Sequence, residues 1–164
     1  MRRAAVLIAL VLLAQIALAQ SFASQRQVHV EQYLRAIDFI GPFRAGIERE
    51  KERAGRTTPF IEFVLNADDA VIERHVARVY AKHLTDREAA FAAAFYQSAA
   101  GRYITQTQKL QPNETRTPIY LAPEHAEDYR QFVATGTEKV LEVLTSDRRV
   151  WIEIMVELEK AQVR

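Results

Sequence analysis

The sequence predicts an all-α fold, a compact multi-helix bundle of six to eight helices in a single domain. Three observations lead to this prediction. Apolar residues recur at offsets of three, four and seven over most of the chain, which is the spacing of one face of an α-helix. Residues that typically begin helices precede several of these runs. The chain has 164 residues and no cysteine, so core packing without disulfides has to stabilise it.

The first predicted core helix covers residues 25–40, and Gly41-Pro42 is expected to end it. Its apolar face consists of Val28, Tyr33, Leu34, Ile37 and Ile40. A short second helix follows, with charges of alternating sign over residues 48–53 and a stop near Gly55. Alternating charges are typical of a solvent-exposed helix face.

Two further helix starts come before the centre of the chain. Thr58 stands before Pro59, and proline is favoured at the first position of a helix. Asp68-Asp69 is expected to cap a longer helix. The apolar stripe of that longer helix consists of Val71, Ile72, Val76, Val79 and Tyr80.

Residues 84–102 are the stretch around which we expect the fold to be organised. Thr85 and Glu88 have the spacing of a capping box, in which each side chain bonds the backbone N–H of the other residue. A helix is therefore predicted to begin at Thr85. The stripe expected to face the core consists of Phe91, Ala94, Phe95 and Ser98.

Small residues in the same stretch predict a close helix contact. Ala90, Ala94 and Gly101 lie within about 40° of one another on a helix of 3.6 residues per turn, so another helix is expected to approach along them. Ser98 is expected to cap a second short helix after a bend, although one continuous helix is the alternative. Tyr96 points about 100° away from the stripe. It either lines a groove or packs in a second layer with its hydroxyl at the surface.

This stretch resembles a bacterial family known as domain of unknown function 2059 (DUF2059). The resemblance is carried by residues 80–88 and by Phe95-Tyr96-Gln97-Ser98-Ala99-Ala100-Gly101-Arg102, within a family-like core of about residues 70–143. Ala99 stands where the family often has proline, and Arg87 where it often has an acid. The resemblance implies an exported helical domain without an assigned activity, and it supplies no catalytic residues.

The second half of the chain is predicted to continue the bundle after a loop at residues 111–117. Pro123 begins the next helix, Thr135-Gly136 interrupts it, and a last helix starts at Ser146-Asp147. Part of this half weakly resembles the central stretch at an offset of 37 residues, which we call the 37-residue echo. It pairs Leu84 with Leu121, Phe95 with Phe132, Ser98 with Thr135 and Arg102 with Lys139, and we treat a structural repeat as a hypothesis.

The N-terminus has the pattern of a secretory signal peptide over residues 1–19. Arg2-Arg3 precedes a short apolar run that ends in Ala17-Leu18-Ala19, and cleavage is expected after Ala19. The run is too short for the roughly 20 residues of a membrane-spanning helix. Without Arg2 and Arg3, 20 of the 22 basic residues remain against 21 acidic ones, a net charge of −1. We therefore expect a periplasmic or secreted domain over residues 20–164, with no stable membrane span and no nucleic-acid partner.

No arrangement of residues typical of catalysis or metal binding is evident. The four histidines, His29, His75, His83 and His125, form no helical metal-binding pair. Ser98 lacks the Gly-x-Ser-x-Gly context of a nucleophile, and no glycine-rich phosphate loop is found. Cysteine chemistry is excluded. We expect no cofactor, no metal and no catalytic residues.

The sequence therefore favours an exported, noncatalytic helical domain that binds an unidentified protein or envelope component. Two alternatives stay open. A carrier of small apolar ligands would need a cavity between helices. A hydrolase would need a site assembled from residues distant in sequence, which a single chain does not reveal.

Overall fold

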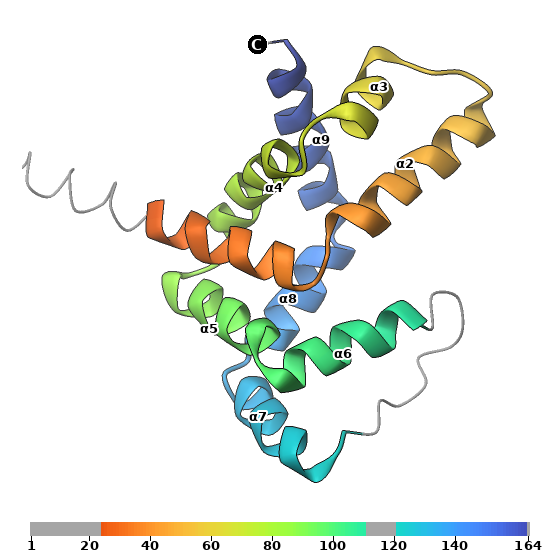
Figure 1. The fold of residues 1–164 in the computed structure, drawn as a ribbon. Coiled ribbons are helices and arrows are strands. Elements are labelled where there is room, and N and C mark those ends of the chain that lie inside the picture. The colour runs from red at the N-terminus through yellow and green to blue at the C-terminus, as the bar shows by residue number, and fades with distance from the viewer. Residues whose placement is uncertain (1–23, 111–120, 164) are drawn as a thin grey trace, which may run out of the picture.

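The computed structural model describes residues 24–110 and 121–163. Within these ranges the chain is helical with no strand, as predicted (Figure 1). An N-terminal helix covers residues 24–36. The helices that follow are α2 (Ile40–Ala54), α3 (Pro59–Asn66), α4 (Asp69–His83), α5 (Asp86–Gln97), α6 (Ala99–Leu110), α7 (Pro123–Ala134), α8 (Thr137–Ser146) and α9 (Arg148–Gln162).

The described residues therefore contain nine helices, and the predicted number of six to eight was too low. The breaks at Ser98 and Gly136 each end one helix and begin another, so stretches that a continuous helix could have spanned are divided. The predicted signal peptide with Ala17 and Ala19, and the predicted loop at residues 111–117, lie outside the described residues.

The break between the first two helices differs from the prediction. The N-terminal helix ends before Asp38, which has a left-handed φ of 51°, and Gly41-Pro42 lies in the first turn of α2 instead of ending the helix before it. Proline is tolerated there because first-turn N–H groups have no partner within the helix. On the N-terminal helix, Val30 is fully buried, whereas Val28 was wrongly assigned to the core and is 47% exposed.

The starts of α3, α4 and α5 are confirmed, because their caps are made by side chains close in sequence. Thr58 Oγ1 accepts from the N–H of Ile61, and Asp68 Oδ1 accepts from the N–H of Ala70. These bonds satisfy N–H groups that the helices leave unpaired.

The N-terminal helix joins two groups of helices (Figure 1). On one side, α4 packs along α9, with α2 and α3 nearby. On the other side, α5 to α8 pack against one another. Arg35 of the N-terminal helix pairs with the buried Glu73 of α4 at 2.6 Å. The Tyr33 ring lies 5.2 Å from that of Tyr96 in α5. This helix thus fixes α4 relative to α5.

The buried face of α5 is rotated from the predicted stripe. Phe95 is buried as expected, but Ala94 is exposed and Phe91 is only half-buried, with the Arg87 guanidinium 5.2 Å from its ring centre. The residues that face the core are Ala89, Ala92, Ala93 and Phe95. A helix this rich in alanine presents an apolar surface on most sides, so its rotation depends on its neighbours.

Gly101 lets α6 lie close to the end of α5, whereas the prediction was that another helix would lie along Ala90, Ala94 and Gly101. Because α6 starts at Ala99, Gly101 is not on the same helix as Ala90 and Ala94, and the predicted row of small residues does not form. A Cβ added at Gly101 would lie 2.2 Å from the Phe95 carbonyl oxygen and 2.5 Å from the Tyr96 Cα. The first turn of α6 therefore packs directly onto the last turn of α5.

The 37-residue echo coincides with helix bounds. Shifting α5, residues 86–97, by 37 gives residues 123–134, which are the bounds of α7. Both helices end with a hydrogen bond to a phenylalanine carbonyl: Ser98 donates its N–H to Phe95, and Thr135 donates its N–H to Phe132. The backbones of the two breaks differ, because Ser98 is extended whereas its counterpart Thr135 is helical and is followed by the left-handed Gly136, with φ of 75°.

Candidate functional site

The motif residues of the central stretch have structural contacts around the break between α5 and α6. Thr85 donates its N–H to the Glu88 carboxylate at 2.7 Å, and Glu88 donates its N–H to Thr85 Oγ1 at 3.2 Å, which makes the capping box. Ser98 Oγ accepts from the N–H of Gly101 at 3.2 Å and caps α6. The Thr85 hydroxyl also donates to the Glu88 carboxylate at 2.7 Å, and all of these contacts hold helix ends.

Aromatic rings from three elements form a cluster around Phe95. Phe95 stacks on Phe132, Tyr96 meets Phe95 and Phe132 edge-on, and the rings of Tyr33 and Tyr129 lie at its borders. Tyr96 is half-buried in this cluster and lines neither of the clefts described below. The Tyr96 ring therefore packs in a second layer beside Phe95 and Phe132.

The tyrosines of this cluster hold their protons. Burial raises the pKa of Tyr33 well above its ordinary value. Burial also raises the pKa of Tyr96, with a further contribution from the charge of Glu138. The pKa of Tyr129 rises to about 12, chiefly because its hydroxyl donates to the Glu138 carboxylate at 2.5 Å. Phenols with a raised pKa stay protonated near neutral pH and do not act as bases.

Two of the histidines lie on the contact between α4 and α9, each beside a glutamate. His75 Nδ1 lies 3.4 Å from Glu157 Oε1, and His83 Nε2 lies 3.4 Å from Glu153 Oε1. Arg78 also pairs with Glu157, at 2.5 Å. Burial alone would raise the pKa of Glu157, but hydrogen bonds from Arg78 and His75 outweigh it and lower the pKa. This seam joins the two helices.

The remaining histidines are separate from this seam. The His125 ring lies tilted against the Tyr103 ring, with centroids 5.6 Å apart, and the buried Nδ1 of His29 has no hydrogen-bond partner among the described residues. Within residues 24–110 and 121–163, no three side chains of the kinds that bind metals lie close enough to hold an ion.

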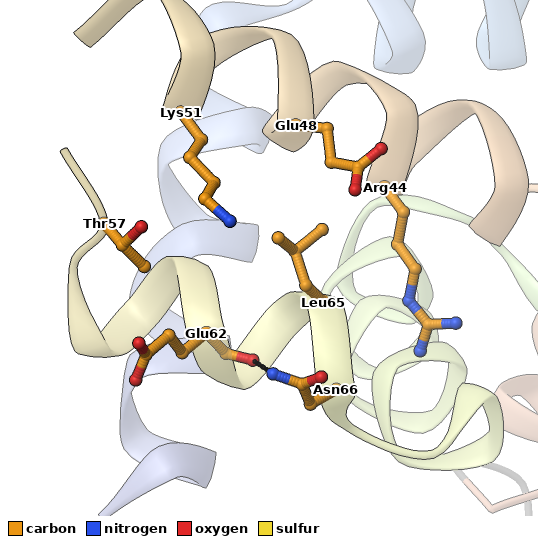
Figure 2. A pocket seen from close by; sticks show the side chains of 7 residues that line it. All are labelled: Arg44, Glu48, Lys51, Thr57, Glu62, Leu65 and Asn66. Atoms are coloured by element: carbon orange, nitrogen blue, oxygen red, sulfur yellow. Dashed lines mark hydrogen bonds between the residues drawn. The ribbon is translucent and has the colours of Figure 1, made fainter. Parts of the chain in front are cut away.

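A polar cleft of about 490 Å³ opens between α2 and α3 (Figure 2). It is lined by Arg44, Glu48, Lys51, Thr57, Glu62, Leu65 and Asn66. Its charges are mixed, and the side chain of Asn66 donates to the backbone carbonyl of Glu62 in the same helix. The cleft thus lacks the excess of one charge that would select an ionic ligand.

Arg44, the strongest hydrogen-bond donor of this cleft, is already occupied. Its guanidinium donates to the backbone carbonyls of Val64 and Ala67 and pairs with the Asp69 carboxylate at 2.5 Å. These contacts satisfy carbonyls at the end of α3 and hold the turn into α4. Arg44 therefore has a structural role and is not free to bind an anion.

A second cleft, of about 450 Å³, runs beside α8 and opens to solvent. Its apolar lining consists of Val140, Val143, Leu144 and Val150, and its polar lining of His83, Gly136, Lys139 and Asp147. Val143 is 54% exposed. Lys139 has no ion-pair partner among the described residues, whereas Asp147 caps α9 by accepting from the N–H of Arg149. We call this feature the α8 cleft.

Comparison with known proteins identifies a family for part of the chain. Residues 70–110, which span α4, α5 and α6, match the sequence model of a family described as "Uncharacterized protein conserved in bacteria (DUF2059)". The chain is therefore similar to the DUF2059 family over these residues. No curated protein and no solved structure matches the chain. The matched segment contains the capping box, the break at Ser98, and Gly101. Of the residues that line the α8 cleft, only His83 lies in this segment.

Sequence reasoning missed the residues that line the α8 cleft. Among the apolar residues of α8, Leu141 and Leu144 are buried, whereas Val143 is exposed. The signal was present, since two valines three positions apart lie beside the buried face rather than on it. Sequence could not place His83 and Val150 beside them, because that requires packing between α4, α8 and α9.

Proposed function

We propose that this protein is an exported, noncatalytic helical module that binds an apolar segment of a protein or envelope component in the α8 cleft. The observation that carries the proposal is the open, apolar-lined surface around the exposed Val143. Exposed apolar surface in a hollow with a polar rim is typical of protein-binding sites. The signal-peptide pattern of residues 1–19 supports export.

Charge at the rim of the cleft indicates the kind of partner. Lys139 lines the cleft beside the valines and has no ion-pair partner among the described residues, so a partner segment with an acidic residue next to its apolar residues would be held there. An amphipathic helix with this composition fits a groove of this kind.

The same geometry favours binding over the alternatives. A carrier would enclose its ligand, whereas both clefts are open to solvent. A hydrolase would place a group with a displaced pKa in a cleft. The described groups with displaced pKa values are Tyr33, Arg35, Tyr80, Tyr96, Tyr129 and Glu157, and none of them lines either cleft.

Site-specific photocrosslinking in the native bacterium tests the proposal. A photoreactive residue at position 143 should give a discrete crosslinked species, whereas the same residue at position 28 should not. Val28 is a matched control because it is a valine of similar exposure, at 47% against 54%, on a different helix. Lys139→Glu combined with the label at position 143 should reduce the yield. Equal yields at positions 28 and 143, or none at either, would rule out binding at the α8 cleft.

A further inference from the structure

The outward face of α9 carries an apolar stripe that nothing in the described chain covers. Ile152 is 54% exposed, Val156 is 43% exposed and Val163 is 87% exposed. The helix packs into the core by Val150, Ile154 and Leu158, which lie on its opposite side. Ile152 and Val156 lie on the helix and Val163 is its C-cap, so the exposed apolar side chains form a row and not an isolated surface residue.

Charged residues complete this row in a regular pattern. The residues Arg149, Ile152, Val156, Glu159 and Val163 follow one another at spacings of three, four, three and four, which is the spacing of a helix seam that faces another helix. Arg149 and Glu159 are exposed, and neither side chain has an ion-pair partner within the described part of the chain. The row therefore has a free cation at one end and a free anion towards the other.

This pattern is complementary to itself in one orientation only. When two copies of α9 pair antiparallel about the level of residue 154, Arg149 lies opposite Glu159 of the other copy, and Ile152 lies opposite Val156. Both pairings occur twice because a twofold axis relates the copies. A parallel pair in register would instead place arginine beside arginine and glutamate beside glutamate, which is unfavourable.

We propose that the occupant of this face is a second copy of the chain, and that the protein forms a twofold antiparallel dimer through α9. The contact is that of one helix, and it is small against the roughly 1,200–2,000 Å² that stable interfaces bury. The dimer is accordingly weak and reversible, with a dissociation constant of the order of tens to hundreds of micromolar. It uses a different face from the α8 cleft, so it stands or falls independently of the proposed function.

Charge reversal tests the orientation and the partner together. Sedimentation velocity is measured on a chain that begins at Gln20, which retains all residues that the structure describes. Arg149→Glu and Glu159→Arg should each raise the dissociation constant of the dimer by about tenfold or more, because each creates two like-charge contacts. An equimolar mixture of the two variants should dimerise again, because both contacts across the mixed dimer are then attractive.

An apolar substitution tests the centre of the contact. Ile152→Ser should weaken the dimer, whereas Val28→Ser, at a valine of similar exposure on the N-terminal helix, should leave it unchanged. Circular dichroism of each variant establishes that it is folded. A wild-type chain that stays monomeric up to about 1 mM would overturn the proposal, since that exceeds the range expected for a contact of this size. It would also be overturned by a mixture of the charge variants that associates no better than either alone.

Discussion

The rings of Phe95 and Phe132 stack face to face, with centroids 4.1 Å apart and planes 2° apart. Phe95 lies near the end of α5 and Phe132 near the end of α7, at the same place in helices whose bounds are 37 residues apart. Both rings are buried, at 7% and 4% exposure. This pair connects the DUF2059 segment to the helices beyond it, so it should contribute strongly to stability.

Phe95→Ala should lower the free energy of unfolding by about 3 to 5 kcal/mol, because it removes a buried ring and leaves a cavity. Chemical denaturation monitored by circular dichroism measures this loss. Phe91→Ala is the control and should cost clearly less, since Phe91 is half-buried and lies under Arg87. A loss at position 95 below about 1 kcal/mol would show that the ring is not in the core. The double variant with Phe132→Ala should reveal a coupling of about 0.5–1.5 kcal/mol.

Gly101→Ala should destabilise the protein by roughly 3 kcal/mol or more, because the added Cβ would collide with the backbone of α5 instead of with a movable side chain. Gly46→Ala in α2 is the matched control. Its Cβ would have a single neighbour, Arg49 Nη2 at 3.9 Å, so a gain of about 0.5–1 kcal/mol from helix propensity is expected. Equal thermal midpoints for the two variants would contradict the packing of α6 onto α5.

Ala99→Pro should leave stability unchanged or raise it by about 0.4–1 kcal/mol. Ala99 is the first residue of α6, and Ser98 before it is already extended, at φ −71° and ψ 169°, as a residue before proline needs to be. Ala90→Pro, inside α5, should cost about 3 kcal/mol or more. Thermal denaturation compares the two. Similar losses for both variants would mean that α5 and α6 form one continuous helix.

Glu157 makes part of the stability depend on pH. Its pKa in the folded protein is below the ordinary value of 4.5, so the unfolded chain binds the proton more tightly. The contribution is therefore fully present above the unfolded pKa and is lost as pH falls through the folded pKa. Urea midpoints measured from pH 7 to pH 3 should fall in the acid range, and the fall should be smaller in Glu157→Gln. Glu52→Gln, at an exposed position of α2, should follow the wild-type curve.

Features set by residues close in sequence could be predicted, whereas those set by packing could not. The sequence identified the helix starts at Thr58, Asp68, Thr85 and Ser98. A capping side chain bonds a backbone N–H only two or three residues further along the chain, so both partners are visible in the sequence. The predicted buried face of α5 was wrong. Alanines lie on most sides of this helix, so the spacing of apolar residues did not distinguish one face from the others. The α8 cleft was not foreseen, since its lining comes from α4, α8 and α9, which are far apart in the chain.

The proposed partner is an envelope component, so the proposal depends on export of the protein. None of the helices in residues 24–110 and 121–163 has the length and apolar character to cross a membrane. The mass of the protein recovered from fractionated cells of the native bacterium tests this condition directly. We predict a chain that begins at Gln20, found in the periplasm or the medium. A chain that still carries Met1 or its first nineteen residues, found in the cytosol, would contradict the proposal of an exported binding module.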